Sequence, residues 1–361
     1  MNAMYLERQR KAQALLQQRE LDALLVLGYE NIRYLTGYSG NAAYLLLTPQ
    51  ENILITDYRY YQRALQETHG ALVVERDREA ESLGACLQRH FAKGVVGFES
   101  ASVSVAVWQD IANTLTGWQC QACNGLIESL RTVKEHWEVA SIRKAAAIAD
   151  EALAETLKLV KAGVAERDLA IELDYRMKQL GSDGVSFDTI LLFGARSSLP
   201  HGKPGDTRLQ HGDMLLVDFG AVVNGYRSDM TRTYVLGEAS AKQQHIFDAV
   251  FAAQQASFAL LKAGTDCKTL NAASERVLAE FGYSEFAGKG LGHGVGLFLH
   301  ETPFINRSTD YQLQAGNVIT IEPGVYIPAL GGVRLEDDVL ITEQGFEFLT
   351  HAPKQFVLQG G

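Results

Sequence analysis

The stretch VDFGAVVNGYRSDMTRT, residues 217–233, places two aspartates eleven positions apart (229 − 218 = 11) around a turn signal. Asp218 interrupts the apolar run Leu215–Phe219, and Asn224 with the following glycine is typical of a tight hairpin turn. A hairpin closing there can bring Asp218 and Asp229 together. Adjacent buried carboxylates are costly to desolvate and raise each other's pKa unless a metal ion lies between them. This segment therefore predicts paired strands that carry a charged site.

A second pair of carboxylates follows the same plan further along the chain. Glu322 ends the apolar stretch VITIEPG, and Glu336 lies in VRLED fourteen residues later (336 − 322 = 14). The proline and glycines of the intervening GVYIPALGG predict a second hairpin. His293 lies in GKGLGHGVGLFLHE, where small residues let the backbone approach a neighbour closely.

Four carboxylates and one imidazole that could converge from strand ends would form an oxygen-rich site. Oxygen-dominated ligands with one histidine suit manganese, iron, cobalt or zinc in a two-metal centre, whereas a structural zinc site would use cysteine and histidine. Each residue alone also has an ordinary explanation, as a turn aspartate, a core histidine or a salt-bridge glutamate. The spacing by itself leaves both interpretations open.

Several stretches of the sequence carry a further signal when they are taken together. They are LPHGKPGD (199–206), residues 217–233, GHGVGLFLHETP (292–303), TIEPGVY (320–326) and GGVRLEDD (331–338), preceded by NIRYLTGYSG (31–40) and LITDYRYY (54–61). In this order they resemble a known family, the pita-bread metallopeptidases, which include methionine aminopeptidase, aminopeptidase P and prolidase. Within that family, LPHG and G-V-R-x-E-D are similar to the proline-specific branch, and the two N-terminal stretches resemble the extra N-terminal domain of that branch.

The resemblance implies two divalent metal ions, with Mn²⁺ expected first and Co²⁺ or Zn²⁺ as possibilities. In the family pattern two carboxylates bridge the ions, and a water between the metals is the nucleophile. All the family's ligands are present, which argues against its metal-free members, such as creatinase, and its non-catalytic relatives. The implied ligands are Asp229 and Glu336 as bridges, Asp218 for one metal, and His293 with Glu322 for the other.

The same resemblance implies further roles around the metals. Glu322 is expected to shuttle the proton, and His201 and His300 to donate hydrogen bonds to the scissile carbonyl and the developing gem-diolate. Tyr226 and Arg334, like His201, are candidates for binding the substrate or supporting the ligands, and Arg334 could steady a carboxylate ligand or the substrate terminus.

The expected reaction is hydrolysis of the Xaa-Pro bond at the N-terminus of dipeptides or short peptides. This bond has no N–H, so a peptidase that grips the scissile N–H cannot use it, whereas a dinuclear centre needs no such donor. Dipeptidase and aminopeptidase activity remain open. Alternatives are methionine-aminopeptidase-like cleavage and a non-catalytic peptide-binding module. A nucleotide-binding enzyme is a third idea, although the N-terminal half has neither a Walker nor a G-x-G-x-x-G sequence.

The length of 361 residues accommodates two domains. We expect an α/β N-terminal creatinase/prolidase-like domain over residues 1–126 and an α+β pita-bread catalytic domain over residues 127–361. The family pattern predicts a homodimer, in which a loop over residues 31–41 reaches the partner's active site.

Composition limits the other partners. A net charge of −10 disfavours general nucleic-acid binding. No apolar run reaches the roughly 18–20 residues that span a bilayer, and the polar N-terminus does not read as a signal peptide. We therefore expect a cytoplasmic protein that binds neither nucleic acid nor membrane.

Overall fold

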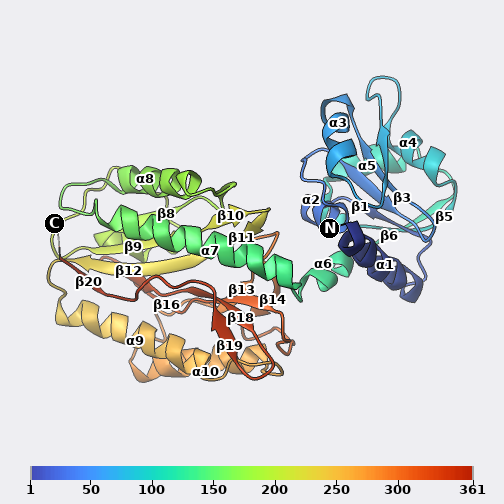
Figure 1. The fold of residues 1–361 in the computed structure, drawn as a ribbon. Helices are drawn as coiled ribbons and strands as arrows, with labels where there is room; N and C mark the ends of the chain where they lie inside the picture. The colour runs from blue at the N-terminus through green and yellow to red at the C-terminus, as the bar shows by residue number, and fades with distance from the viewer. Residues whose placement is uncertain (1, 360–361) are drawn as a thin grey trace. The chain divides into compact units, whose positions relative to one another are not determined.

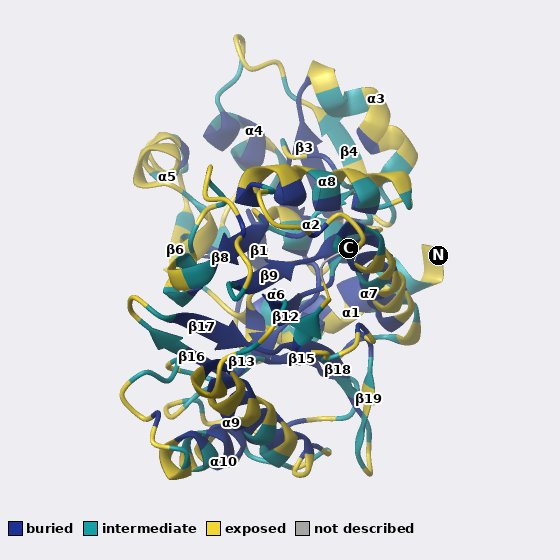
Figure 2. Cartoon of the chain, turned by 90° about the vertical axis from the view of Figure 1, so that its left-hand side faces the viewer, coloured by how far each residue is buried: buried dark blue, intermediate teal, exposed yellow. Residues whose placement is uncertain are grey.

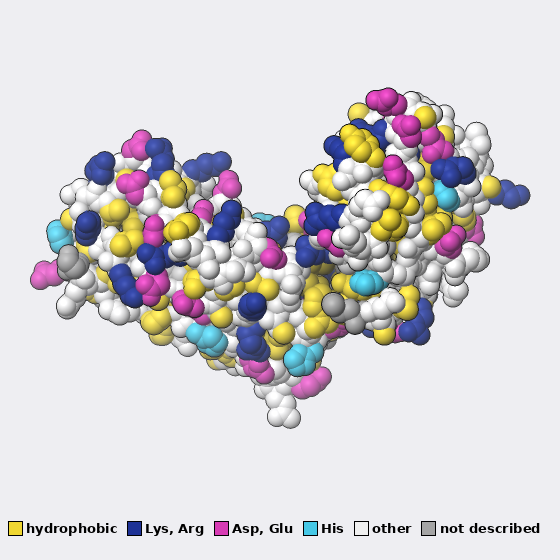
Figure 3. Space-filling model, turned by 45° about the horizontal axis from the view of Figure 1, so that its top comes forward, with side chains coloured by type: hydrophobic (Ala, Val, Ile, Leu, Met, Phe, Trp, Pro, Cys, Tyr) yellow, Lys and Arg dark blue, Asp and Glu magenta, His cyan; other side chains and the backbone are white. Residues whose placement is uncertain are grey.

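The computed structural model describes residues 2–359, and the chain divides into two compact units between Arg131 and Thr132. Figure 1 labels the elements of both units. No helix within residues 2–359 is both long and apolar enough to cross a membrane. On the face drawn in Figure 3, acidic and basic side chains are interspersed, and no broad basic field appears there.

The N-terminal unit is built on one six-stranded sheet in the order β4-β3-β2-β1-β5-β6. β1 pairs antiparallel with β2 and parallel with β5, so the sheet of this α/β unit is mixed. Leu25, Leu46 and Ile55 of the sheet pack with Leu87 and Ile111 of the covering helices. Its elements are α1 (Asn2–Gln18), β1 (Ala23–Val26), α2 (Tyr29–Thr36), β2 (Tyr44–Leu47), β3 (Asn52–Thr56), α3 (Tyr58–Glu67), β4 (Leu72–Glu75), α4 (Leu83–His90), β5 (Gly94–Phe98), α5 (Val105–Ala112), β6 (Trp118–Ala122) and α6 (Leu126–Arg131).

The loop expected over residues 31–41 is present in only part of that range. Residues 31–41 do not form a loop throughout, because α2 covers Tyr29–Thr36. Asn31 is buried and donates from its side-chain amide to Glu99 and Glu128, at 2.6 and 2.8 Å. The apolar residues Ile32 and Leu35 of the same helix lie three positions apart, on one helix face, and both are buried in the core.

The first half of the C-terminal unit is a sheet in the order β20-β12-β9-β8, covered by two long helices. α7 begins with a capping box between Glu135 and Glu138, and Gly181 follows α8 in the left-handed conformation with φ of 98°. Figure 2 shows α8 with a buried inner side and an exposed outer side. The elements are α7 (His136–Leu157), α8 (Glu166–Gln179), β7 (Gly184–Val185), β8 (Ile190–Phe193), β9 (Met214–Phe219), β10 (Ala221–Val223), β11 (Tyr226–Arg227), β12 (Met230–Leu236) and β20 (Val357–Leu358).

The second half repeats this plan with a sheet in the order β14-β13-β15-β18-β19 and the helices α9 and α10. Figure 1 shows α7 and α8 on one side of the strands of this unit and α9 and α10 on the other. The strands that carry the predicted site therefore lie between two helical layers. The elements are α9 (Ala241–Phe258), α10 (Cys267–Glu280), β13 (Gly292–Gly294), β14 (Glu301–Ile305), β15 (Val318–Ile321), β16 (Gly324–Ile327), β17 (Gly331–Arg334), β18 (Asp337–Ile341) and β19 (Phe346–Phe348).

Both predicted hairpins form, but the second differs in detail. Asn224 and Gly225 connect β10 to β11 with positive φ angles of 52° and 78°, as a tight turn requires. The apolar run 333–341 does not form one continuous strand but is divided between β17 and β18. β17 pairs with β16, whereas β18 pairs with β15, so the chain changes partners at Leu335 and Glu336.

Candidate metal centre

The first pair of carboxylates is brought together by the ladder between β9 and β12. Asp218 lies directly opposite Thr231. Asp229 precedes Thr231 by two positions, and residues two apart on an extended chain face the same side. The side chains of Asp218, Thr231 and Asp229 are therefore directed to one face, into a shared cavity that both aspartates line.

The second pair is brought together by the register of two antiparallel ladders, one on each side of it. Ile321 pairs with Asp337 in the ladder of β15 and β18, and Gly324 pairs with Arg334 in that of β16 and β17. Glu322 and Glu336 lie between these pairs in the same register. Directly opposed residues of antiparallel strands project to the same face with Cβ atoms roughly 4.5–5.5 Å apart. The break between β17 and β18 therefore occurs at the position of the charged pair.

His293 reaches this face because its strand lies unusually close to β15. A Cβ on the preceding Gly292 would stand 2.1 Å from the carbonyl oxygen of Thr320, so only glycine fits there. The hydroxyl oxygen of Thr320 accepts a hydrogen bond from the His293 backbone N–H at 3.1 Å. The imidazole Nδ1 lies 3.1 Å from the Gly294 carbonyl oxygen, which leaves Nε2 directed at the carboxylates.

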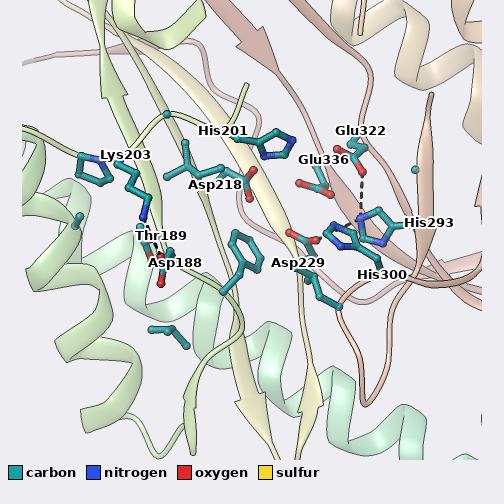
Figure 4. A pocket seen from close by; sticks show the side chains of 18 of the residues that line it. Asp188, Thr189, His201, Lys203, Asp218, Asp229, His293, His300, Glu322 and Glu336 are labelled. Carbon is teal, nitrogen blue, oxygen red and sulfur yellow. Dashed lines mark ion pairs between the residues drawn. The ribbon is translucent and has the colours of Figure 1, made fainter. Parts of the chain in front are cut away.

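The structure gathers these side chains into one cluster. The Nε2 atom of His293 lies 3.3 Å from Oε1 of Glu322 and 3.7 Å from Oδ2 of Asp229. Asp229, His293 and Glu336 each offer a ligand atom, and these three atoms lie within 4.8 Å of one another. Figure 4 shows the carboxylates of Asp218, Asp229, Glu322 and Glu336 directed toward the same space.

That space is a cavity of about 900 Å³, within the range of small-ligand sites. His201 and His300 line it together with all five predicted ligands. The rings of His293 and His300 meet edge to face with their centroids 4.5 Å apart. All seven residues predicted as ligands or catalytic groups thus border one cavity.

Arg334 lies behind the carboxylates, in contact with Asp218 rather than in the cavity wall. Its guanidinium donates to Asp218 Oδ2, to Thr231 Oγ1 at 3.0 Å and to the Tyr326 hydroxyl at 2.6 Å. Thr231 in turn donates to Glu336 Oε2 at 2.6 Å. One guanidinium therefore ties a member of the first carboxylate pair to a member of the second.

Tyr226 lies on a different side of the unit. Its hydroxyl donates to Glu138 Oε1 at 2.7 Å, and it does not border the cavity. Tyr226 thus joins the β10–β11 hairpin to α7.

Sequence reasoning did not single out Thr231, Thr320, Tyr326 or Asp338. Asp338 Oδ2 accepts a hydrogen bond from the Asp229 backbone N–H at 2.8 Å, and Thr320 donates to Glu322 Oε1 at 3.2 Å. Thr231, Thr320 and Asp338 each lie two positions from a predicted ligand on an extended strand. The alternation of strand faces was the available signal, because residues two apart share a face.

A buried ion pair holds the turn that carries His300. Lys134 Nζ lies 3.1 Å from Glu301 Oε2, and the two side chains are 0% and 7% exposed. Glu301 Oε1 accepts from the Phe298 backbone N–H at 2.8 Å. The carboxylate of Glu301 therefore anchors the turn that ends at His300.

The cluster holds several buried carboxylates close together, and this shifts their pKa values. Burial, with the neighbouring charges of Glu336 and Asp218, raises the pKa of Asp229 well above its ordinary value. Burial, with the neighbouring charges of Glu322 and Asp218, likewise raises the pKa of Glu336 well above its ordinary value. Burial would also raise the pKa of Glu322, but the hydrogen bond and charge of His293 outweigh it and lower that pKa.

The residues present fit divalent cations. Asp218 Oδ1 is buried and has no hydrogen-bond partner among residues 2–359. Four carboxylates and an imidazole supply the oxygen-rich donor set that transition-metal ions accept, and a cation would relieve their mutual repulsion. The cluster therefore has the chemistry of a metal centre.

Comparison with known proteins gives the same picture. The model of metallopeptidase family M24 matches residues 140–343, and that of the creatinase/prolidase N-terminal domain matches residues 8–133. The chain is 35% identical to the uncharacterized peptidase YqhT of Bacillus subtilis, over 96% of this chain and 99% of the relative. It is 33% identical to the Xaa-Pro dipeptidase of Pyrococcus horikoshii, over 97% of this chain and 99% of the relative.

Solved structures agree over the full length. The Xaa-Pro dipeptidase of Bacillus anthracis superposes with a TM-score of 0.92 at 32% identity, covering 98% of this chain and 100% of that chain. The X-Pro aminopeptidase of Thermotoga maritima superposes with a TM-score of 0.89 at 34% identity, covering 97% of this chain and 99% of that chain. The predicted fold, an α/β N-terminal domain followed by an α+β pita-bread domain, is confirmed.

Proposed function

Because this chain belongs to metallopeptidase family M24, we propose that it hydrolyses the Xaa-Pro peptide bond at the N-terminus of dipeptides or short peptides. The observation that carries the proposal is the convergence of four carboxylates and His293 on one cavity, in a chain whose relatives include Xaa-Pro dipeptidases. The family implies divalent metal ions and peptide substrates.

We propose that Asp218, Asp229, His293, Glu322 and Glu336 hold two divalent ions, with Asp229 and Glu336 shared between them. The oxygen-rich donor set suits Mn²⁺, with Co²⁺ or Zn²⁺ as alternatives. When bound, such ions polarise the scissile carbonyl and lower the pKa of water toward about 7. The ligands' own contribution is to hold this chemistry among largely buried side chains of the cavity wall.

The side chains around the ligands supply proton transfer and charge stabilisation. Glu322, whose pKa is lowered despite its burial, is ionised at neutral pH and can accept a proton at a carboxylate oxygen. Burial and the neighbouring His293 lower the pKa of His300, so its imidazole is neutral and carries one N–H donor. His300 and His201 would direct such donors at the carbonyl oxygen as negative charge develops on it.

This arrangement suits the bond before proline because every proposed interaction involves the carbonyl or the attacking water. The proline nitrogen has no N–H, so an enzyme that grips that group loses the contact. None of the roles assigned to His201, His300 and Glu322 needs an N–H on the proline nitrogen.

The test is a panel of peptides given to purified protein supplied with manganese or cobalt. We expect cleavage of Ala-Pro or Leu-Pro, or of Ala-Pro-Ala, and loss of cleavage when a chelator is added. Exclusive cleavage of Met-Ala-Ser would instead favour a methionine-aminopeptidase-like enzyme. Robust activity of an Asp229→Ala variant would contradict the assigned site.

A non-catalytic peptide-binding module is the competing role, and metal analysis separates the two. Two equivalents of metal in protein purified without chelator support the enzyme, and none supports the module. We also propose a cytoplasmic homodimer, and sedimentation of the purified chain at several concentrations tests its oligomeric state.

A further inference from the structure

The cavity wall contains three lysine or arginine side chains, and within residues 2–359 only one of them lacks a carboxylate partner. Arg167 lies 2.8 Å from Asp206, and Lys203 lies 3.8 Å from Asp188, the pair that Figure 4 shows apart from the metal cluster. Lys289 makes neither an ion pair nor a hydrogen bond with any residue in the range 2–359, although it borders the same cavity. It is therefore the wall's uncompensated positive charge.

Lys289 lies on the segment that leads directly into β13 and His293. Gly288 and Gly290 flank it, and Gly290 has a φ of 103°, in the left-handed region that favours glycine. The segment runs beside the end of β14, because the Leu291 backbone N–H donates to the Ile305 carbonyl at 2.8 Å. Lys289 and the end of β14 thus border the same part of the cavity.

An apolar side chain lines the same cavity as this lysine and the metal ligands. Phe304 is directly opposite His293 in the ladder of β13 and β14, so the two side chains share a face. Phe304 is 43% exposed although its neighbours Pro303 and Ile305 are buried, and it borders the cavity. A large exposed aromatic ring beside a predicted metal ligand is a contact surface for an apolar substrate group.

We propose that Phe304 and Lys289 form the subsite for the residue that follows the scissile bond. Phe304 packs against the proline ring, and the Lys289 ammonium pairs with the free α-carboxylate of that proline. The inference rests on the proposed function and narrows its substrate class to dipeptides. A dipeptide carries its carboxylate on the proline itself, whereas a tripeptide carries it one residue further away.

The test compares Ala-Pro with Ala-Pro amide, which differ in the negative charge of the C-terminus. In manganese-supplied protein we expect Lys289→Gln to lower kcat/KM for Ala-Pro about fivefold relative to kcat/KM for Ala-Pro amide. The loss should come mainly from a higher KM for Ala-Pro, and its size is that of an exposed charge pair. Lys289→Arg should restore most of the ratio. Lys262→Gln is the matched control, because Lys262 is exposed and lies outside the cavity wall.

Added salt provides an independent measurement, because screening weakens a pair of exposed charges. Sodium chloride should raise the KM of the wild type for Ala-Pro more than that of Lys289→Gln. For Phe304, replacement by alanine should raise KM for the dipeptide and its amide alike, and replacement by leucine should restore most of the loss.

Two results would overturn the inference while leaving the proposed function intact. One is that Lys289→Gln leaves the preference for Ala-Pro over Ala-Pro amide, measured as the ratio of their kcat/KM values, unchanged. The other is that the wild type itself shows no such preference, with a ratio of one. If the wild type cleaves no Xaa-Pro peptide, the proposed function fails instead. The subsite is then judged by calorimetry: equal affinity of wild type and Lys289→Gln for free L-proline overturns it, and weaker affinity of the variant supports it.

Discussion

At the scale of the residue, the centre is an accumulation of like charge that only a cation or protons can neutralise. Asp229 and Glu336 are buried and next to other carboxylates, and the pKa of each is raised well above its ordinary value. The guanidinium of Arg334 is engaged by Asp218. The negative charge of the cluster therefore exceeds its positive charge, which favours divalent cations.

Replacing Asp229 by asparagine should affect the stability of the metal-free protein and its stabilisation by metal in different ways. In metal-free protein at alkaline pH the variant should be at least as stable as the wild type, because one buried charge is removed. Manganese at a hundredfold excess over Kd should stabilise the wild type by about 2.7 kcal/mol, which is seen as a rise in Tm. This rise should largely disappear in the variant. Differential scanning fluorimetry with and without metal measures both effects.

The matched control for this experiment is Asp310→Asn, whose side chain is 92% exposed and does not border the cavity. This variant should retain the full manganese-induced rise in Tm. An equal loss in both variants would show that the effect is not specific to the centre.

The raised pKa values also predict how the metal-free protein responds to pH. Between the ordinary carboxyl pKa of about 4 and the raised values of Asp229 and Glu336, the folded chain binds more protons than the unfolded chain. Its free energy of unfolding must therefore fall as pH rises through this window. We expect the Tm of chelator-treated protein to decrease from about pH 5 to pH 8.

Metal should weaken or reverse this slope, because cations bind the ionised carboxylates and compete with protons. Thermal unfolding of the manganese-loaded protein over the same pH series measures the difference. Parallel slopes with and without metal would contradict the placement of the ions among these groups.

At the scale of the element, the centre depends on strands that approach more closely than side chains would permit. Gly292 lies against the Thr320 backbone, and a Cβ on Gly220 would stand 1.8 Å from the Ser228 carbonyl oxygen. The first contact brings β13, with His293, up to β15. The second lies beside the strands that carry Asp218 and Asp229. Both glycines therefore determine how closely the ligand-bearing strands can pack.

Gly292→Ala should consequently damage the centre without touching a ligand. The added methyl group must move β13 away from β15, which we expect to cost about 1–3 kcal/mol of stability and to weaken metal binding by displacing His293. Gly345→Ala is the control, since a Cβ there meets nothing within 4 Å. Denaturant unfolding and metal titration of both variants measure the effect, and normal metal affinity in Gly292→Ala would contradict it.

At the scale of the whole molecule, charge and chemistry are distributed unequally. Every predicted ligand and catalytic residue lies in the unit that begins at Thr132. Two divalent ions would offset four of the ten net negative charges of the chain. The acidic composition therefore reflects the centre in part.

This distribution predicts that residues 132–361, produced alone, retain the metal centre. The unit has its own buried cores on both sides of the site, so we expect it to fold and to bind two manganese ions. Native mass spectrometry counts the ions, and the same fragment carrying Asp229→Ala is the control. Failure of a folded fragment to bind metal would show that the N-terminal unit is required.

Much of this protein could be predicted from its sequence because the decisive signals are local. Apolar runs and turn residues predicted the strands β9, β12 and β15 and the hairpin at Asn224, and the types and order of the acidic residues predicted an oxygen-rich centre. The resemblance supplied the family and fold, which the comparisons confirm. The assignment of individual ligands stays a prediction for the metal-binding experiments.

Only the tertiary structure decided which side chains face one another. Glu322 and Glu336 are opposed because β15 pairs with β18 while β16 pairs with β17, and this change of partner divides a run that reads as one continuous strand. Thr231 meets Glu336 across 105 positions of chain, and Phe304 meets His293 through the register of β13 and β14. Propensity and periodicity act over a few residues, whereas strand register is set by packing between distant segments, so the sequence determined the chemistry available and the fold determined its arrangement.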